Sequence, residues 1–87
     1  MKYKIIIAEQ ALKSLTRLPG KFRRQISEKI DVLAENPRPS GTEKLQGYEL
    51  YRIRSGDYRI VYQIKDNILI VLVVRIGHRK DIYRNLS

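Results

Sequence analysis

The hydrophobic positions change their period along the chain, first in the manner of a strand and then in the manner of helices. Residues 2–7 alternate weakly and then run apolar, which suits a strand. Apolar residues then recur at helical spacing over residues 9–18 and again over residues 20–35. Pro19-Gly20 breaks the pattern between these stretches and predicts a helical hairpin with a tight turn. The repeating apolar positions are Ala8, Ala11, Leu12, Leu15 and Leu18, followed by Phe22, Ile26, Ile30 and Leu33.

The second half of the chain has the pattern of three strands. Residues 36–41 form a loop, since they are rich in proline, serine and glycine. Residues 50–54 and 58–64 alternate, whereas residues 68–74 are apolar throughout, as is typical of a strand covered on both faces. We therefore predict one α+β domain over residues 1–87, of order β-α-α-β-β-β. Its two-helix hairpin packs on one face of a mainly antiparallel four-stranded sheet.

The turn between the two alternating strands determines how they pair. Gly56-Asp57 has the composition of a two-residue hairpin loop, which places Arg54 directly opposite Arg59. On the core face, every apolar residue then lies opposite an apolar one, and Arg52 joins the two arginines on the other face. Like charges directly across a strand pair are destabilising. Because arginine forks hold phosphate oxygens in two-point contacts, we interpret this face as an anion site.

An alternative is that Asp57 and Glu49 pair with these arginines and that the face is only solvated. The C-terminal segment favours the anion site, because cations, the single histidine and a tyrosine follow Gly77, where the chain is expected to change direction. A tyrosine beside arginines can stack on a nucleobase while the arginines hold the backbone, although a C-terminal aromatic can also pack back on the sheet. The residues concerned are His78, Arg79, Lys80, Tyr83 and Arg84.

Charge supports a polyanionic partner. The 87 residues include 18 lysines and arginines against 9 acidic residues, a net charge of +9, which favours nucleic acid, an anionic surface or an acidic protein. The chain has no cysteine and one histidine, so disulfides are excluded and a zinc cluster is implausible. No apolar run reaches the length of a membrane span, and we expect a protein of the reducing cytoplasm.

Three segments of the chain resemble the RelE/ParE toxin superfamily: residues 44–47, 51–62 and 77–83. The order of elements is also similar over essentially the whole chain. The resemblance implies the toxin of a bacterial or archaeal toxin–antitoxin module, held silent by an acidic RelB-like antitoxin. RelE-like members cleave mRNA in the ribosomal decoding site. They use the 2′-hydroxyl of the RNA as nucleophile and leave a 2′,3′-cyclic phosphate, without a metal or cofactor.

The resemblance also assigns catalytic roles. Arg59 and Arg79 match arginines that bind the scissile phosphate and stabilise charge in the transition state, with Arg54 beside them. Tyr83 matches the tyrosine that stacks on the base. His78, as a side chain that exchanges a proton near neutral pH, completes the catalytic candidates.

The general base is open, because Arg52 and Arg54 stand where the best-known family member has lysine. Lysine can lose a proton if its environment favours it, whereas arginine effectively cannot. His78 and Tyr83 are the alternatives. We assign Arg52, together with Lys44 and Lys80, to substrate binding.

Three rival functions remain: a ParE-like inhibitor of DNA gyrase with the same fold, a nucleic-acid-binding module without chemistry, and a structural protein with a solvated basic surface. The combination of Arg59, Arg79 and Tyr83 favours the ribonuclease branch.

Overall fold

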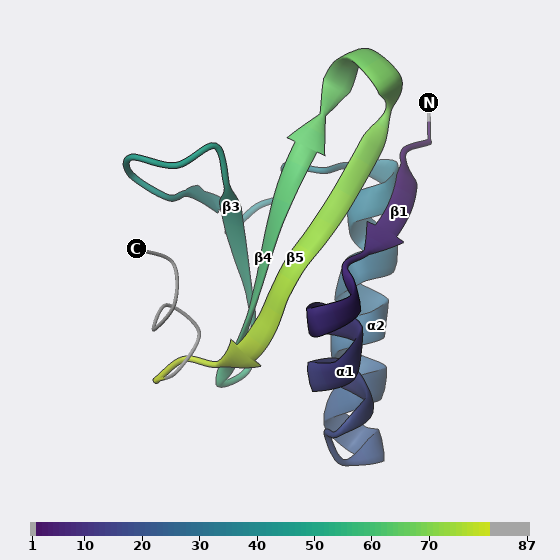
Figure 1. The fold of residues 1–87 in the computed structure, drawn as a ribbon, viewed down its shortest axis with the longest axis vertical. Helices are drawn as coiled ribbons and strands as arrows, with labels where there is room; N and C mark the ends of the chain where they lie inside the picture. Colours follow the sequence, from purple (N-terminus) through teal and green to yellow (C-terminus); the bar gives the residue numbers. More distant parts are fainter. Residues whose placement is uncertain (1, 81–87) are drawn as a thin grey trace.

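A helical hairpin lies along one side of a twisted sheet, whose strands run side by side across the molecule (Figure 1). The computed structural model describes residues 2–80. Its elements are β1 (Lys4–Ile7), α1 (Glu9–Thr16), α2 (Gly20–Glu35), β2 (Glu43–Lys44), β3 (Tyr51–Ser55), β4 (Tyr58–Lys65), a 3-10 turn (Asp66–Ile68) and β5 (Ile70–His78).

The sheet has the order β1-β5-β4-β3-β2 within residues 2–80. β1 pairs with β5 in parallel, and every other neighbouring pair is antiparallel. α1 packs over β5, while α2 packs against β1 and β3. The predicted α+β class, with a two-helix hairpin on one face of a mainly antiparallel sheet, is confirmed. The sheet has five strands rather than four, because β2 contains only two residues and shows no alternation that a sequence pattern could reveal.

The core forms where the apolar stripes of the helices meet the sheet. The buried cluster consists of Ala11, Leu15, Ile26, Ile30, Leu33, Ile53, Ile60, Tyr62, Val71, Val73 and Ile76. The first helix is shorter than the predicted range of residues 9–18. Leu12 lies within it but is 46% exposed, and the helix ends at Thr16. It stops before Leu18 because the ring of Pro19 disfavours helical backbone in the preceding residue.

The last strand is longer than predicted and begins later. It covers Ile70–His78 rather than residues 68–74, and the 3-10 turn Asp66–Ile68 precedes it. Gly77 therefore lies inside the strand, opposite Arg59, and the expected change of direction there was wrong. An irregularity in the β4–β5 register at Val61/Tyr62 inserts an extra residue on β5.

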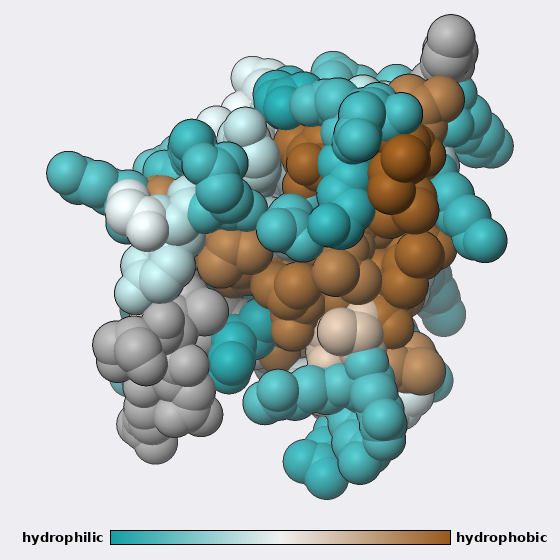
Figure 2. Space-filling view, turned by 45° about the horizontal axis from the view of Figure 1, so that its top comes forward, coloured by the Kyte–Doolittle hydropathy of each residue, from teal (hydrophilic) through white to brown (hydrophobic). Residues whose placement is uncertain are grey.

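The face of the sheet away from the helices is partly apolar. Ile6 is 39% exposed and lies opposite Leu72, which is itself half-buried. Figure 2 shows this hydrophobic surface with hydrophilic side chains around it. Charged groups of the outer face therefore lie next to an apolar area instead of forming a uniform basic surface.

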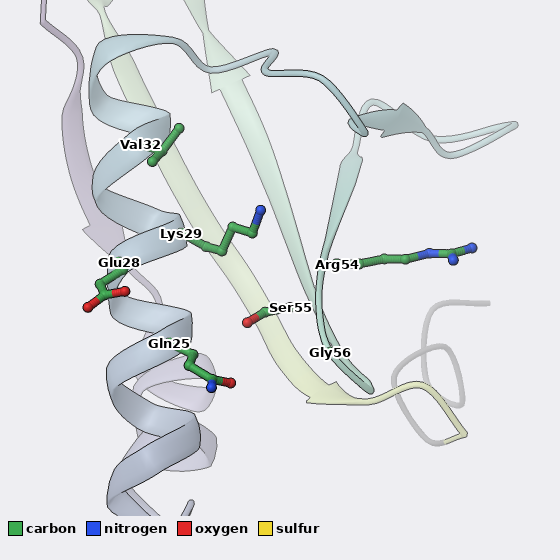
Figure 3. Close-up of a pocket in the computed structure, with 7 residues that line it drawn as sticks. All are labelled: Gln25, Glu28, Lys29, Val32, Arg54, Ser55 and Gly56. Atoms are coloured by element: carbon green, nitrogen blue, oxygen red, sulfur yellow. The ribbon is translucent and has the colours of Figure 1, made fainter.

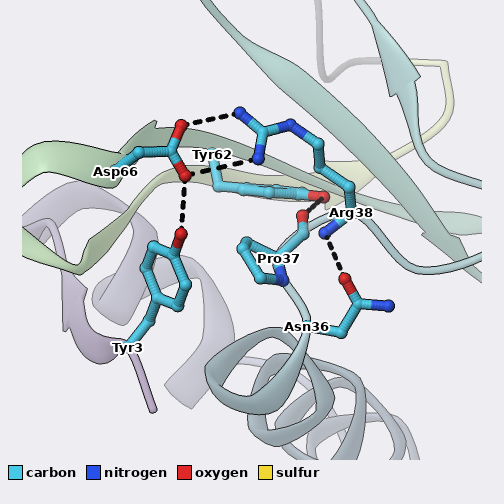
Figure 4. A network of polar contacts seen from close by, with 6 residues as sticks. All are labelled: Tyr3, Asn36, Pro37, Arg38, Tyr62 and Asp66. Atoms are coloured by element: carbon cyan, nitrogen blue, oxygen red, sulfur yellow. Dashed lines mark hydrogen bonds and ion pairs between the residues drawn. The ribbon is translucent and has the colours of Figure 1, made fainter. Parts of the chain in front are cut away.

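A polar network closes the end of the sheet where β4 meets β5 (Figure 4). The Asp66 carboxylate accepts hydrogen bonds from the Arg38 guanidinium at 2.9 and 3.3 Å and from the Tyr3 hydroxyl at 2.6 Å. These bonds, that of Arg38 first, hold the pKa of Asp66 below its usual value. The buried Tyr62 hydroxyl donates to the Pro37 carbonyl at 2.8 Å, and burial raises the pKa of Tyr62. The network ties β1, the α2–β2 loop and the β4–β5 turn together.

Candidate functional site

The β3–β4 hairpin pairs in the predicted register. Arg54 lies opposite Arg59, and Ser55 lies opposite Tyr58. Gly56 occupies the first position of the two-residue loop with φ of +61°, a conformation that a type II′ turn requires there and that glycine adopts without strain. This turn chemistry places the two arginines directly across from each other.

The pleat of β3 sends neighbouring side chains to opposite faces. In Figure 3, Ser55 points toward α2, whereas Arg54 points away from it. A groove between α2 and the hairpin lies on the helix side; it is lined by Gln25, Glu28, Lys29, Val32, Arg54, Ser55 and Gly56. The Arg54 guanidinium itself lies on the outer face of the sheet.

Three successive carbonyl groups of the turn hold two of the predicted catalytic arginines. Nη1 of Arg59 donates to the carbonyls of Gly56 at 3.4 Å and Tyr58 at 3.2 Å. The backbone N–H of Arg79 donates to the Asp57 carbonyl at 2.8 Å. Arg59 is only 8% exposed, so the expectation of an open face does not extend to this residue. The turn thus fixes the side chain of Arg59 and the backbone of Arg79 at one end of the sheet.

Within residues 2–80, neither Arg54 nor Arg59 forms an ion pair with a carboxylate, and Asp57 pairs with no cation. The alternative in which Asp57 and Glu49 neutralise the arginines is therefore not what the structure shows. Glu49 instead pairs with Lys44 at 3.6 Å, where both side chains are exposed. Two guanidinium groups at adjacent positions without a carboxylate form the local surplus of positive charge that an anion would neutralise.

Arg52 has a carboxylate partner that was not predicted from the sequence. Its guanidinium lies 2.6 Å from Glu43 on the neighbouring strand β2. Because β2 was not predicted, nothing in the sequence pattern placed Glu43 beside Arg52. Arg52, Arg54 and Arg59 lie on the same face of the sheet. Arg52 differs from the other two because a carboxylate neutralises its charge.

Strand β5 completes the outer face. Arg54, Arg59 and Gly77 follow one another across three strands, and the glycine leaves the position beside Arg59 without a side chain. Arg75 lies two residues earlier, opposite Val61. Arg75 was not among the predicted site residues, although its spacing of two from Gly77 was a usable signal.

The structure does not bring His78 to the arginines. It lies opposite Tyr58, and the two rings meet edge to face with their centroids 5.8 Å apart. Tyr58 in turn packs against Phe22 of α2, so His78 lies on the helix side of the sheet. Lys80 is exposed in the turn that follows β5. Tyr83 lies outside the described residues.

In the part of the chain that the structure describes, no three histidine or acidic side chains are grouped to hold a metal ion. None of the helices in residues 2–80 is long and apolar enough to cross a membrane.

The sequence matches the family model described as "ParE toxin of type II toxin-antitoxin system, parDE" over residues 5–83. It is 36% identical to the mRNA interferase toxin RelE of Escherichia coli K12 over 83 residues, which cover 92% of this chain and 86% of that protein. The toxin RelE of Mycobacterium tuberculosis is 34% identical over 84 residues, covering 94% and 87% of the two chains.

The fold is similar to that of toxins in solved toxin–antitoxin complexes. In the RelE–RelB complex of Pyrococcus horikoshii the TM-score is 0.81 at 32% identity, covering 91% of this chain and 97% of that one. In the intact RelBE complex of E. coli the TM-score is 0.76 at 35% identity, covering 87% and 95%. Sequence and fold converge on one group of toxins over nearly the whole chain.

Proposed function

This chain belongs to the RelE/ParE toxin superfamily of type II toxin–antitoxin systems, and we propose that it acts as an mRNA interferase. In this proposal the toxin is an endoribonuclease that cleaves messenger RNA in the cytoplasm, on the ribosome, without a metal ion. Its relatives in E. coli and Shigella flexneri carry the name mRNA interferase, which supports the ribonuclease branch of the superfamily.

The observation that carries the proposal is the pair Arg54 and Arg59, which no carboxylate neutralises within residues 2–80. A planar guanidinium presents several N–H donors in a fork that matches phosphate oxygens. Because the turn carbonyls already fix Arg59, its donors are preorganised before an RNA phosphate arrives. Preorganised donors contribute most where charge develops in the transition state.

The proposed reaction is an internal transfer of the phosphodiester. The 2′-oxygen attacks the adjacent phosphorus while the bond from phosphorus to the 5′-oxygen breaks, giving a 2′,3′-cyclic phosphate and a 5′-hydroxyl. The proton leaves the 2′-hydroxyl and a proton is delivered to the departing 5′-oxygen. Arg59 and Arg79 bind the scissile phosphate and stabilise the negative charge that accumulates on its oxygens, with Arg54 beside them. Tyr83 stacks on the neighbouring base.

The base that removes the 2′-proton is not assigned to a side chain. Arg52 and Arg54 cannot serve, because a guanidinium stays protonated in proteins. His78 lies on the helix side of the sheet, away from the arginines. Positioning of the RNA by the ribosome and stabilisation of phosphate charge then carry the reaction, while Arg52, Lys44 and Lys80 contribute to RNA binding.

The partner of this toxin is a RelB-like antitoxin, the partner that its solved neighbours hold in their complexes. We propose that the antitoxin is acidic and covers the arginine face, because the net charge of +9 favours an oppositely charged partner.

The experiment that tests the function is primer extension on cellular mRNA after brief expression of the toxin, with Arg59→Ala at equal expression as the matched control. We expect new 5′ ends within coding regions for the wild type and none for the variant. Growth arrest without any new RNA ends would contradict the proposal.

A second candidate, inhibition of DNA gyrase, is favoured by one observation, since the matching family description names ParE. A supercoiling assay with purified gyrase separates the two functions. The ribonuclease proposal predicts unchanged supercoiling at toxin concentrations that stop translation, whereas loss of supercoiling without RNA cleavage would support the gyrase inhibitor.

A further inference from the structure

The imidazole of His78 connects the end of β5 to the helical layer. Its ring meets Tyr58 edge to face, with centroids 5.8 Å apart and an interplanar angle of 83°. The Tyr58 ring lies 5.3 Å from that of Phe22 on α2. Three rings therefore link α2, β4 and the last residue of β5, so the orientation of the imidazole is fixed by packing.

The same imidazole accepts a hydrogen bond from the turn that follows. The backbone N–H of Lys80 donates to Nδ1 of His78 at 3.2 Å. A backbone N–H can only donate, so Nδ1 must be the unprotonated nitrogen and the ring proton lies on Nε2. The bond thus selects one neutral tautomer.

Arg79 lies between the two residues of this contact. Its own N–H donates to the Asp57 carbonyl at 2.8 Å, while the next N–H, that of Lys80, donates to His78. Two adjacent peptide groups are therefore each held by a hydrogen bond, one to the hairpin turn and one to the imidazole. The flanking peptide groups determine where the Cα of Arg79 lies. His78 therefore helps to set the position from which the Arg79 side chain extends.

We propose that His78 is a positioning residue, which acts through Nδ1 to hold the Arg79–Lys80 turn and thereby aligns Arg79 with the scissile phosphate. This inference rests on the proposed ribonuclease function. His78 lies on the helix side of the sheet, away from Arg54 and Arg59, and this placement argues against a role as the general base. A positioning role is compatible with this placement. A displacement of about 1 Å in a catalytic group can lower a rate about 10²-fold, so a loosened turn is sufficient to impair the reaction.

The test compares His78→Asn, His78→Gln and His78→Leu in single-turnover cleavage of ribosome-bound mRNA. The amide oxygen of asparagine lies as many bonds from the backbone as Nδ1, whereas that of glutamine corresponds to Nε2. We expect the asparagine variant to keep its cleavage rate within a few-fold of the wild type. The glutamine and leucine variants should lose about 10- to 100-fold in the cleavage step with nearly unchanged RNA affinity, because phosphate contacts dominate binding.

The pattern among the variants decides the outcome. If glutamine retains activity and asparagine does not, His78 acts through Nε2 and the inference is overturned. It is also overturned if all three variants cleave like the wild type, or if all three lose activity equally.

A second readout does not depend on cleavage. Nitrogen NMR of the wild-type toxin should show the Nε2–H tautomer of His78, and the Lys80 amide should exchange slowly in the wild type and His78→Asn but rapidly in His78→Gln and His78→Leu. If the wild type cleaves no RNA, the proposed function fails, and these measurements still test the contact. A Nδ1–H tautomer or an unprotected Lys80 amide would refute the positioning role.

Discussion

The arginines at the two ends of strand β4 differ in their hydrogen-bond and ion-pair partners. At the β4–β5 end, Arg38 donates to both oxygens of Asp66 (Figure 4). Its guanidinium carbon also lies 5.3 Å from the centroid of the Tyr51 ring. At the hairpin end, Arg59 donates to the carbonyls of Gly56 and Tyr58. Arg54 lies directly across from it, and within residues 2–80 neither has a carboxylate partner.

We infer that this difference separates an arginine that stabilises the fold from arginines that bind a ligand. Arg38 and Asp66 satisfy each other, so the pair joins loops and leaves little charge for a partner. Arg54 and Arg59 repel each other in the free protein, and in the proposed function their positive charge binds an anion. Loss of Arg38 should therefore affect stability, and loss of Arg59 should affect activity.

The largest expected effect is on catalysis. Arg59→Ala and Arg79→Ala should each lower the cleavage rate about 10²–10³-fold, which corresponds to ~2.7–4 kcal/mol for a lost donor to transition-state charge. Arg38→Ala should cleave like the wild type per folded molecule. Single-turnover kinetics with thermal unfolding of each variant check this. Full activity of both alanine variants at the hairpin end would show that the site is misplaced.

The next effect concerns the antitoxin. Its association rate should fall about tenfold or more between low and high salt, because attraction between opposite charges accelerates encounter and salt screens it. Arg54→Gln should weaken this salt dependence, whereas Arg38→Gln should leave it unchanged. Stopped-flow mixing measures the rates. An association rate that does not respond to salt would argue against electrostatic steering.

A smaller effect is expected on stability at the network end. Tyr62→Phe removes the hydroxyl that donates to Pro37 and should lower the free energy of unfolding by about 1–2 kcal/mol, without changing cleavage. Tyr48→Phe, at an exposed tyrosine, is the matched control. Denaturant unfolding compares the two, and equal stability of both variants would mean that the Tyr62 hydrogen bond contributes nothing.

The smallest effect is on the pH dependence of stability. Hydrogen bonds from Arg38 and Tyr3 lower the pKa of Asp66 in the folded protein, so the stabilisation is present above the unfolded value of about 3.9 and is lost as the pH falls through the lower folded value. Asp66→Asn should therefore have a lower Tm than the wild type at pH 6, with the gap closing below about pH 4. A gap that stays constant across this range would exclude the linkage.

The register of the β3–β4 hairpin could be predicted from the sequence, whereas the ion-pair partners of the arginines could not. Alternation and a two-residue turn are local signals, and together they placed Arg54 opposite Arg59 correctly. The Arg38–Asp66 contact joins two loops 28 positions apart, and Glu43 belongs to a strand too short to show a period. No local pattern records such contacts.

The placement of His78 shows a second limit. Residues 68–74 are apolar throughout, so the sequence does not indicate which face of the sheet each residue of β5 occupies. The irregularity at Val61/Tyr62 also changes the alternation of side chains in the middle of the strand. A bulge reverses which faces the later residues occupy, so Ile76 is buried in the core like Val73, and His78 follows on the helix side.

A titration of the free toxin with inorganic phosphate, followed by amide NMR shifts, tests most directly the claim that the hairpin end holds an anion while the network end does not. We expect saturable shifts at Arg54, Arg59 and Gly77 that share one binding constant and disappear in Arg59→Ala, while the shifts of Arg38 and Asp66 stay unchanged. Shifts centred on Arg38, or the same binding constant in Arg59→Ala as in the wild type, would contradict this claim.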